Sequence, residues 1–88
     1  MRGSELLQHS ARIVEGKELE YGTTYKNMEE FAARISFHLG ISVTPQQAVC
    51  ILLELKMSRL SHDSDHLDSR LDLAGYVAVL QEDINHQA

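Results

Sequence analysis

The sequence has 88 residues and a formal net charge of −5 at pH 7. A chain of this length forms one small domain whose hydrophobic core alone gives marginal stability, and a disulfide within the chain is excluded because Cys50 is its one cysteine. The negative charge argues against a nucleic-acid-binding protein, which needs a basic face to displace counterions from phosphates.

The first 26 residues predict a short helix followed by a loop that wraps the body of the domain. Apolar residues repeat at helical spacing over residues 6–14, and the pattern stops at Gly16. The stretch GKELEYGTTYKN that follows carries two glycines and two threonines, which is typical of an irregular connector. Residues 27–88 are then expected to form the helical core of this single domain.

Two capping signatures mark the next helices. Asn27 with Glu30, and Thr44 with Gln47, each predict a capping box at a helix N-terminus. The helix predicted over residues 45–61 begins with a proline and is apolar nearly all round. Because a helix of this kind must be enclosed on several sides, we expect it to be the central helix of a bundle that continues across a subunit interface.

A last helix is expected to begin at Asp65 or Asp68. The SHDSDH turn before it is short, so the last two helices should form an antiparallel hairpin. The predicted fold is all-α, with three to four helices around this central hairpin, packed into a homo-oligomeric bundle. One apolar stripe of the last helix consists of Leu73, Val77, Leu80 and Ile84.

The lone cysteine and the apolar runs bear on location and stability. A free cysteine within an apolar run is typical of a buried residue in a reduced, cytoplasmic protein. The longest apolar run, AVCILLEL, is too short to span a bilayer, and the N-terminal stretch lacks the apolar core of a signal peptide. With no disulfide and no zinc-binding Cys/His spacing, self-association is the source of stability that we expect.

Charged residues interrupt the apolar pattern of the predicted hairpin. Lys56 and Arg59 share one face of their helix, and Asp68 and Asp72 share a face of the next. In one interpretation, a cation pairs with Asp72 across the hairpin and fixes its register. In the other, the cations exceed what the aspartates neutralise and hold an anionic ligand such as a phosphate.

Two further groups of residues are candidates for structure or for binding. Gly75 costs helix stability, and its plainest explanation is the close approach of another helix or a loop. Tyr76 beside it needs a partner for its hydroxyl. Tyr21 and Tyr25, with Lys17, have the chemistry to stack a base and hold a phosphate; alternatively, they pin the loop onto the bundle.

Motifs along most of the chain resemble a family of small bacteriophage and prophage proteins without an assigned function. They are YG at 21–22, NMEEFAARI at 27–35, LGISVTPQQAV at 39–49, LKMSRL at 55–60 and HLDSRLDLAGY at 66–76. Members of that family usually have an acidic residue after YG, where this sequence has Thr23. The chain is more distantly similar to all-α nucleoside triphosphate pyrophosphohydrolases, which hold magnesium with two carboxylate pairs. EGKE at 15–18 and DHLD at 65–68 do not fall convincingly within helices as those pairs do.

These observations predict a non-enzymatic, oligomeric phage protein that binds a small nucleotide without a cofactor or metal. One version is the sequestration of a nucleotide signal made by bacterial anti-phage defence. The residues expected to bind the ligand are Lys17, Tyr21, Tyr25, Lys56, Arg59, Asp68, Asp72 and Tyr76.

Two alternatives remain open. One is magnesium-dependent hydrolysis of a nucleotide, in which Lys56 holds the phosphate and carboxylates hold the metal. The other is a helical adaptor that binds and blocks a host protein. The carboxylates of the enzymatic alternative are Asp68, Asp72 and a glutamate such as Glu30 or Glu54.

Overall fold

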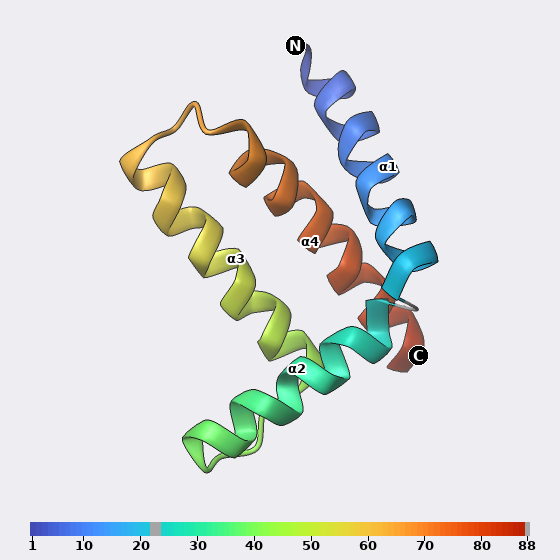
Figure 1. Cartoon of the computed structure of the whole chain (residues 1–88), viewed down its shortest axis with the longest axis vertical. Coiled ribbons are helices and arrows are strands. Elements are labelled where there is room, and N and C mark those ends of the chain that lie inside the picture. The colour runs from blue at the N-terminus through green and yellow to red at the C-terminus, as the bar shows by residue number, and fades with distance from the viewer. Residues whose placement is uncertain (22–23, 88) are drawn as a thin grey trace.

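The computed structural model describes residues 1–21 and 24–87, apart from the side chains of 19–21 and 87. The described residues form four helices and no strand (Figure 1), so the predicted all-α fold is confirmed. The bounds of the helices are α1 Gly3–Tyr21, α2 Thr24–Leu39, α3 Pro45–His62 and α4 Leu67–Gln87.

The central helix of the domain is α4. It packs against each of the other three: α1 and α3 lie on either side of it, and α2 crosses α3 and α4 near one end (Figure 1). α3 and α4 form the predicted antiparallel hairpin. Within one chain α3 packs chiefly on α2 and α4 and leaves Ile51, Leu55 and Met57 44%, 46% and 55% exposed, so the bundle across a subunit interface in which it was expected to be central stays a prediction.

The predicted wrapping loop is also wrong. α1 continues through Gly16 to Tyr21, and α2 begins at Thr24, so only residues 22–23 separate the two helices, and these lie outside the described residues. Asn27 lies inside α2 and therefore does not cap it. A glycine inside a helix costs about 1 kcal/mol relative to alanine, a cost that the packing of α1 against α4 outweighs.

The capping box of α3 is confirmed. The Thr44 hydroxyl accepts a hydrogen bond from the Gln47 backbone N–H at 3.1 Å, and the Gln47 side-chain oxygen accepts one from the Thr44 N–H at 2.9 Å. α4 begins at Leu67, and neither aspartate expected to start it does so. Instead, His66 Nδ1 accepts from the Ser69 N–H at 3.3 Å, as the side chain of a capping residue does.

α1 reaches the centre of α4 at Gly75. A Cβ atom at this glycine would stand 3.3 Å from Ser10 Oγ and 3.3 Å from Val14 Cγ2. Close by, the Ser10 hydroxyl donates a hydrogen bond to the Leu71 carbonyl at 2.8 Å. The prediction that Gly75 admits a close neighbour is therefore confirmed, and the neighbour is α1.

Two glycine-to-alanine variants test this contact. Gly16→Ala is expected to raise the free energy of unfolding by about 1 kcal/mol, because its methyl group meets nothing within 4 Å. Gly75→Ala is expected to gain less or to lose stability, because its methyl group crowds Ser10 and Val14. Urea denaturation of both variants measures the difference; equal gains would contradict the close contact.

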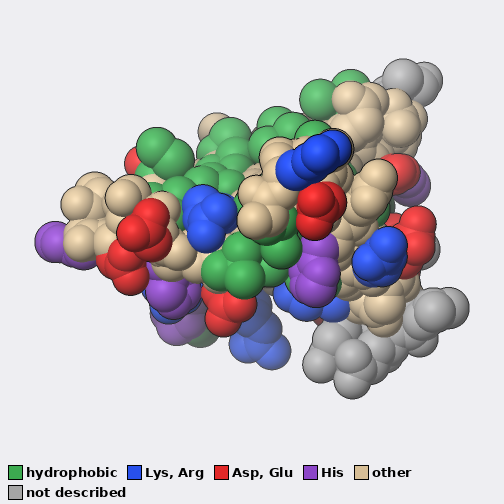
Figure 2. All heavy atoms as spheres, turned by 90° about the horizontal axis from the view of Figure 1, so that it is seen from above, with side chains coloured by type: hydrophobic (Ala, Val, Ile, Leu, Met, Phe, Trp, Pro, Cys, Tyr) green, Lys and Arg blue, Asp and Glu red, His purple; other side chains and the backbone are tan. Residues whose placement is uncertain are grey.

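The buried core is small, and much apolar surface remains exposed. The buried hydrophobic residues among the described ones are Ala32, Ala48, Val49, Leu71 and Val79. Figure 2 shows hydrophobic side chains gathered along its upper edge, which is the face turned away from the viewer in Figure 1. Cys50, expected to be buried, is exposed, because α3 at the edge of the fold has no neighbour on its outer side.

Within the described residues, no helix combines the length and the apolar composition that crossing a membrane requires.

Candidate functional site

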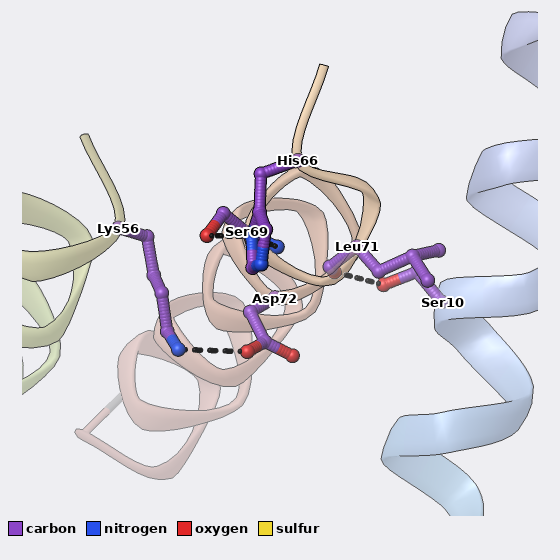
Figure 3. A network of polar contacts seen from close by, with 6 residues as sticks. All are labelled: Ser10, Lys56, His66, Ser69, Leu71 and Asp72. Carbon is purple, nitrogen blue, oxygen red and sulfur yellow. Dashed lines mark hydrogen bonds and ion pairs between the residues drawn. The ribbon is translucent and has the colours of Figure 1, made fainter. Parts of the chain in front are cut away.

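Lys56 and Asp72 form an ion pair between the two arms of the hairpin. The Lys56 ammonium lies 2.9 Å from an Asp72 carboxylate oxygen, and their side chains are 10% and 25% exposed (Figure 3). The interpretation that a cation pairs with Asp72 across the hairpin is therefore confirmed for Lys56. Arg59, one turn further along α3, is exposed. Of the two predicted cations, Arg59 is the one that remains open to solvent.

A hollow lies between α1, the start of α2 and α4, and it brings together residues that the sequence analysis assigned to different groups. Lys17 lines it from α1, while Asp72 and Tyr76 line it from α4. Gly75 contributes bare backbone, and the remaining lining is mostly apolar. The cavity volume of the hollow is about 50 Å³, and about 350 Å³ when the open solvent at its mouth is included. A cavity of about 50 Å³ has room for the edge of a ring and not for a whole nucleotide.

Tyr76 connects this hollow to the ion pair. Burial raises the pKa of the Tyr76 phenol, the Asp72 carboxylate raises it further, and Lys56 and Arg59 act in the opposite direction. The phenol therefore stays protonated at neutral pH and can donate a hydrogen bond. These influences also show that Tyr76 lies within the electrostatic field of the Lys56–Asp72 pair and of Arg59.

The hollow takes its shape from contacts on the two sides of α4. Figure 3 shows Ser10 and Lys56 reaching α4 from opposite sides, Ser10 at the Leu71 carbonyl and Lys56 at Asp72. At the end of α4 nearest the hairpin turn, His66 Nδ1 lies 2.7 Å from the Ser69 hydroxyl. Sequence reasoning did not single out Ser10 or Ser69, because a small polar residue in an apolar helix gives no sign of which helix it will face.

The other predicted ligand-binding residues do not line this hollow. Asp68 is exposed in the first turn of α4. The Tyr25 ring stacks on the ring of His86, with centroids 3.6 Å apart, beside a separate shallow hollow that Glu18 and Glu82 also line. The predicted role of Tyr21 depends on a side chain outside the described residues. Lys56 also does not line the hollow; it reaches the site through Asp72.

Asp83 is a buried acid that sequence reasoning missed. Its exposed fraction is 0%, and neither carboxylate oxygen has a hydrogen-bond partner. Burial raises the pKa of this carboxyl, while the nearby His86 lowers it. A signal was present in the sequence: Leu71, Gly75, Val79 and Asp83 recur every four residues, and all four are buried.

The carboxylates of the enzymatic alternative do not come together. Among the side chains that the structure describes, which leave out those of residues 19–23 and 87–88, no three from His, Cys, Asp or Glu lie close enough to hold a metal ion. Asp68, Asp72, Glu30 and Glu54 therefore do not form the ligand set that this alternative needs.

Comparison with known proteins places the chain in a family. Residues 5–84 match the model of a family described as a domain of unknown function (DUF6378). The chain belongs to this family. The DUF6378 match includes most of α1 and α4, the whole of α2 and α3, and every residue that lines the hollow, so the candidate site lies inside the region that defines the family.

A curated relative of this DUF6378 chain is the Gene 55 protein of Mycobacterium phage L5. It is 28% identical over 79 residues, which cover 88% of this chain and 51% of that protein. The chain therefore spans about half the length of this relative. The predicted phage-associated family of unknown function is supported, whereas the likeness to nucleotide pyrophosphohydrolases is not. No solved structure matches the chain.

Proposed function

We propose that this protein is a non-enzymatic phage protein that binds a small nucleotide at the hollow between α1 and α4. The observation that carries the proposal is the convergence of Lys17, Asp72 and Tyr76 on one mostly apolar hollow with bare backbone at Gly75. A few polar groups around an apolar hollow are typical of sites that bind small organic molecules. The similarity to a phage protein supports the phage setting.

The proposed binding mode follows from the size and charge of the hollow. The cavity of about 50 Å³ accepts one edge of a base, with the rest of the nucleotide lying across the open mouth. The phosphate then lies on Lys17, an exposed amine at the rim. The Tyr76 hydroxyl and the Asp72 carboxylate supply a donor and an acceptor for the base or the ribose.

In this binding mode Lys56 has a positioning role. It holds the Asp72 carboxylate from the side of α3 and does not itself contact the phosphate. The sequence analysis expected Lys56 and a loop tyrosine to hold the ligand together; the binding mode proposed here replaces them with Lys17 and Tyr76. Sequestration of a nucleotide signal of anti-phage defence is one biological use of such a site.

Calorimetric titration with cyclic dinucleotides, ADP-ribose-type nucleotides and nucleoside phosphates tests the proposal. We expect at least one of them to bind, and Lys17→Gln to weaken that binding about tenfold through loss of the contact with the phosphate. Arg12→Gln is the matched control, because it removes the same charge from an exposed position of α1 that does not line the hollow.

The absence of heat with every nucleotide, from a protein that circular dichroism shows to be helical, would overturn nucleotide binding. An equal loss of affinity in Lys17→Gln and Arg12→Gln would overturn the placement of the phosphate on Lys17, because the effect would then come from the general charge of the chain. Release of pyrophosphate in the presence of magnesium would replace the proposal with the enzymatic alternative.

A second candidate function is binding to a host protein, and a specific surface favours it. Near the α2–α3 turn, Phe37, Leu39 and Ile41 are 84%, 62% and 60% exposed. Leu39 and Ile41 line a shallow apolar hollow together with Cys50 and Ile51. Stoichiometric capture of one host protein, lost in Phe37→Glu, would support this function over nucleotide binding.

A further inference from the structure

We propose that the uncovered face of the α3–α4 hairpin binds a second copy of this chain. We call it the hairpin face; it consists of Met57 on α3 and Leu73, Val77, Leu80 and Ile84 on α4. This inference is independent of the proposed nucleotide site, which lies on the side of α4 that meets α1.

The arrangement of the helices leaves this face bare. α1, α4 and α3 lie side by side, and α2 covers one face of that layer near one end (Figure 1). None of the described helices lies on the opposite face (Figure 1), and Figure 2 shows hydrophobic side chains gathered there. Met57, Val77 and Ile84 are 55%, 58% and 49% exposed, although all three are large and apolar.

The area that the chain leaves exposed matches what a dimer buries. The chain exposes 6179 Å² to solvent, whereas a compact monomer of 9.9 kDa exposes about 5200 Å². The excess is about 1000 Å², and a stable interface of standard size buries about 800 Å² on each partner. One interface with a second copy would therefore bring the exposed area of each chain to that of an ordinary compact protein.

The spacing of the apolar residues on α4 suits a helix of the same kind as partner. Leu73, Val77, Leu80 and Ile84 are separated by four, three and four residues, which is the heptad spacing of paired helices. β-branched residues alternate with leucines along this stripe, a pattern that favours two helices over larger assemblies. Leu73 and Leu80 are already half-buried within the single chain, so part of the stripe is fixed before any pairing.

The charges around the stripe do not oppose such pairing. Ala74 and Gln81, which flank it, are uncharged, and Asp72 and Asp83 point into the domain interior or the hollow. Two copies of a chain with a net charge of −5 repel each other in general, but Ala74 and Gln81 add no charge beside the stripe. A two-fold axis along the stripe would pair each α4 with its copy.

Sedimentation equilibrium of the full chain at micromolar concentrations tests the inference. We expect a dimer of about 20 kDa, twice the 9.9 kDa of one chain. Val77→Glu is expected to weaken dimerisation roughly 100-fold, because it places a carboxylate in an apolar contact. Met57→Glu tests the same face from α3. Phe37→Glu is the matched control: it adds the same charge at a position 84% exposed, on α2 and outside the hairpin face.

A wild-type chain that sediments as a monomer would overturn dimerisation through the hairpin face. Dissociation caused by Phe37→Glu, and not by the two variants of the hairpin face, would overturn it as well. If Val77→Glu loses its helical circular dichroism, Met57→Glu decides. Because nucleotide titration does not depend on the hairpin face, failure of one proposal leaves the other intact.

Discussion

Asp72→Asn is expected to lower the free energy of unfolding by about 3–5 kcal/mol, because it leaves a buried ammonium without its partner. The Lys56 side chain is 10% exposed, and the carboxylate 2.9 Å away is the ion-pair partner that compensates for its removal from water. Asparagine keeps the size of the aspartate but carries no charge. Urea denaturation followed by circular dichroism measures the loss.

The opposite truncation is expected to cost less. Lys56→Met leaves the Asp72 carboxylate, but that side chain is 25% exposed and can turn toward water. Combining Lys56→Met with Asp72→Leu should recover most of the loss, since an apolar pair of similar volume often replaces a buried ion pair without penalty. If the losses measured for Lys56→Met alone and for Asp72→Leu alone simply added in the double variant, the two charges would not be energetically coupled.

Asp83→Asn is expected to raise the free energy of unfolding by about 1–3 kcal/mol at neutral pH, because it removes an unpaired charge from the interior. Asp83 is fully buried, and both of its oxygens lack a hydrogen-bond partner. Burial raises its pKa in the folded protein above the ordinary 3.8. Thermal unfolding of the variant and of the wild type at several pH values measures the gain.

The sign of the pH dependence follows from that raised pKa. Below the ordinary pKa of 3.8, the carboxyl is protonated in both the folded and the unfolded chain, so Asp83 carries no charge penalty. As pH rises through the raised folded-state pKa, the penalty becomes complete. The advantage of Asp83→Asn should therefore vanish in acid. Glu82→Gln, at the exposed neighbouring position, is the control and should show no such gain; a gain that is the same in acid and at neutral pH would contradict the assignment.

Local signals in the sequence predicted the hairpin and its ion pair. The Thr44–Gln47 capping box involves residues three apart, and the short turn after α3 leaves few ways to arrange the next helix. An antiparallel hairpin places Lys56 opposite Asp72 on the neighbouring helix, and this predicts that the two side chains can form an ion pair. These features depend on contacts that are close in the sequence or fixed by a short connector.

The hollow could not be predicted, because it depends on a long-range contact of α1. Gly16 indicated a helix end, yet α1 continues for more than another turn, since its packing on α4 outweighs a local preference. The stretch GKELEYGTTYKN predicts a loop, and a loop places Lys17 with Tyr21 and Tyr25. In the structure it lies with Asp72 and Tyr76 instead.

The packing of α1 on α4 also affects how tightly the hollow can bind a ligand. α1 packs chiefly on α4, with the Ser10 hydroxyl on the Leu71 carbonyl and the bare backbone of Gly75 between the helices. A molecule seated there would touch both helices at once, so its binding free energy would add to that which keeps α1 docked. Binding of such a molecule and the docking of α1 would then be thermodynamically linked, so that each would favour the other.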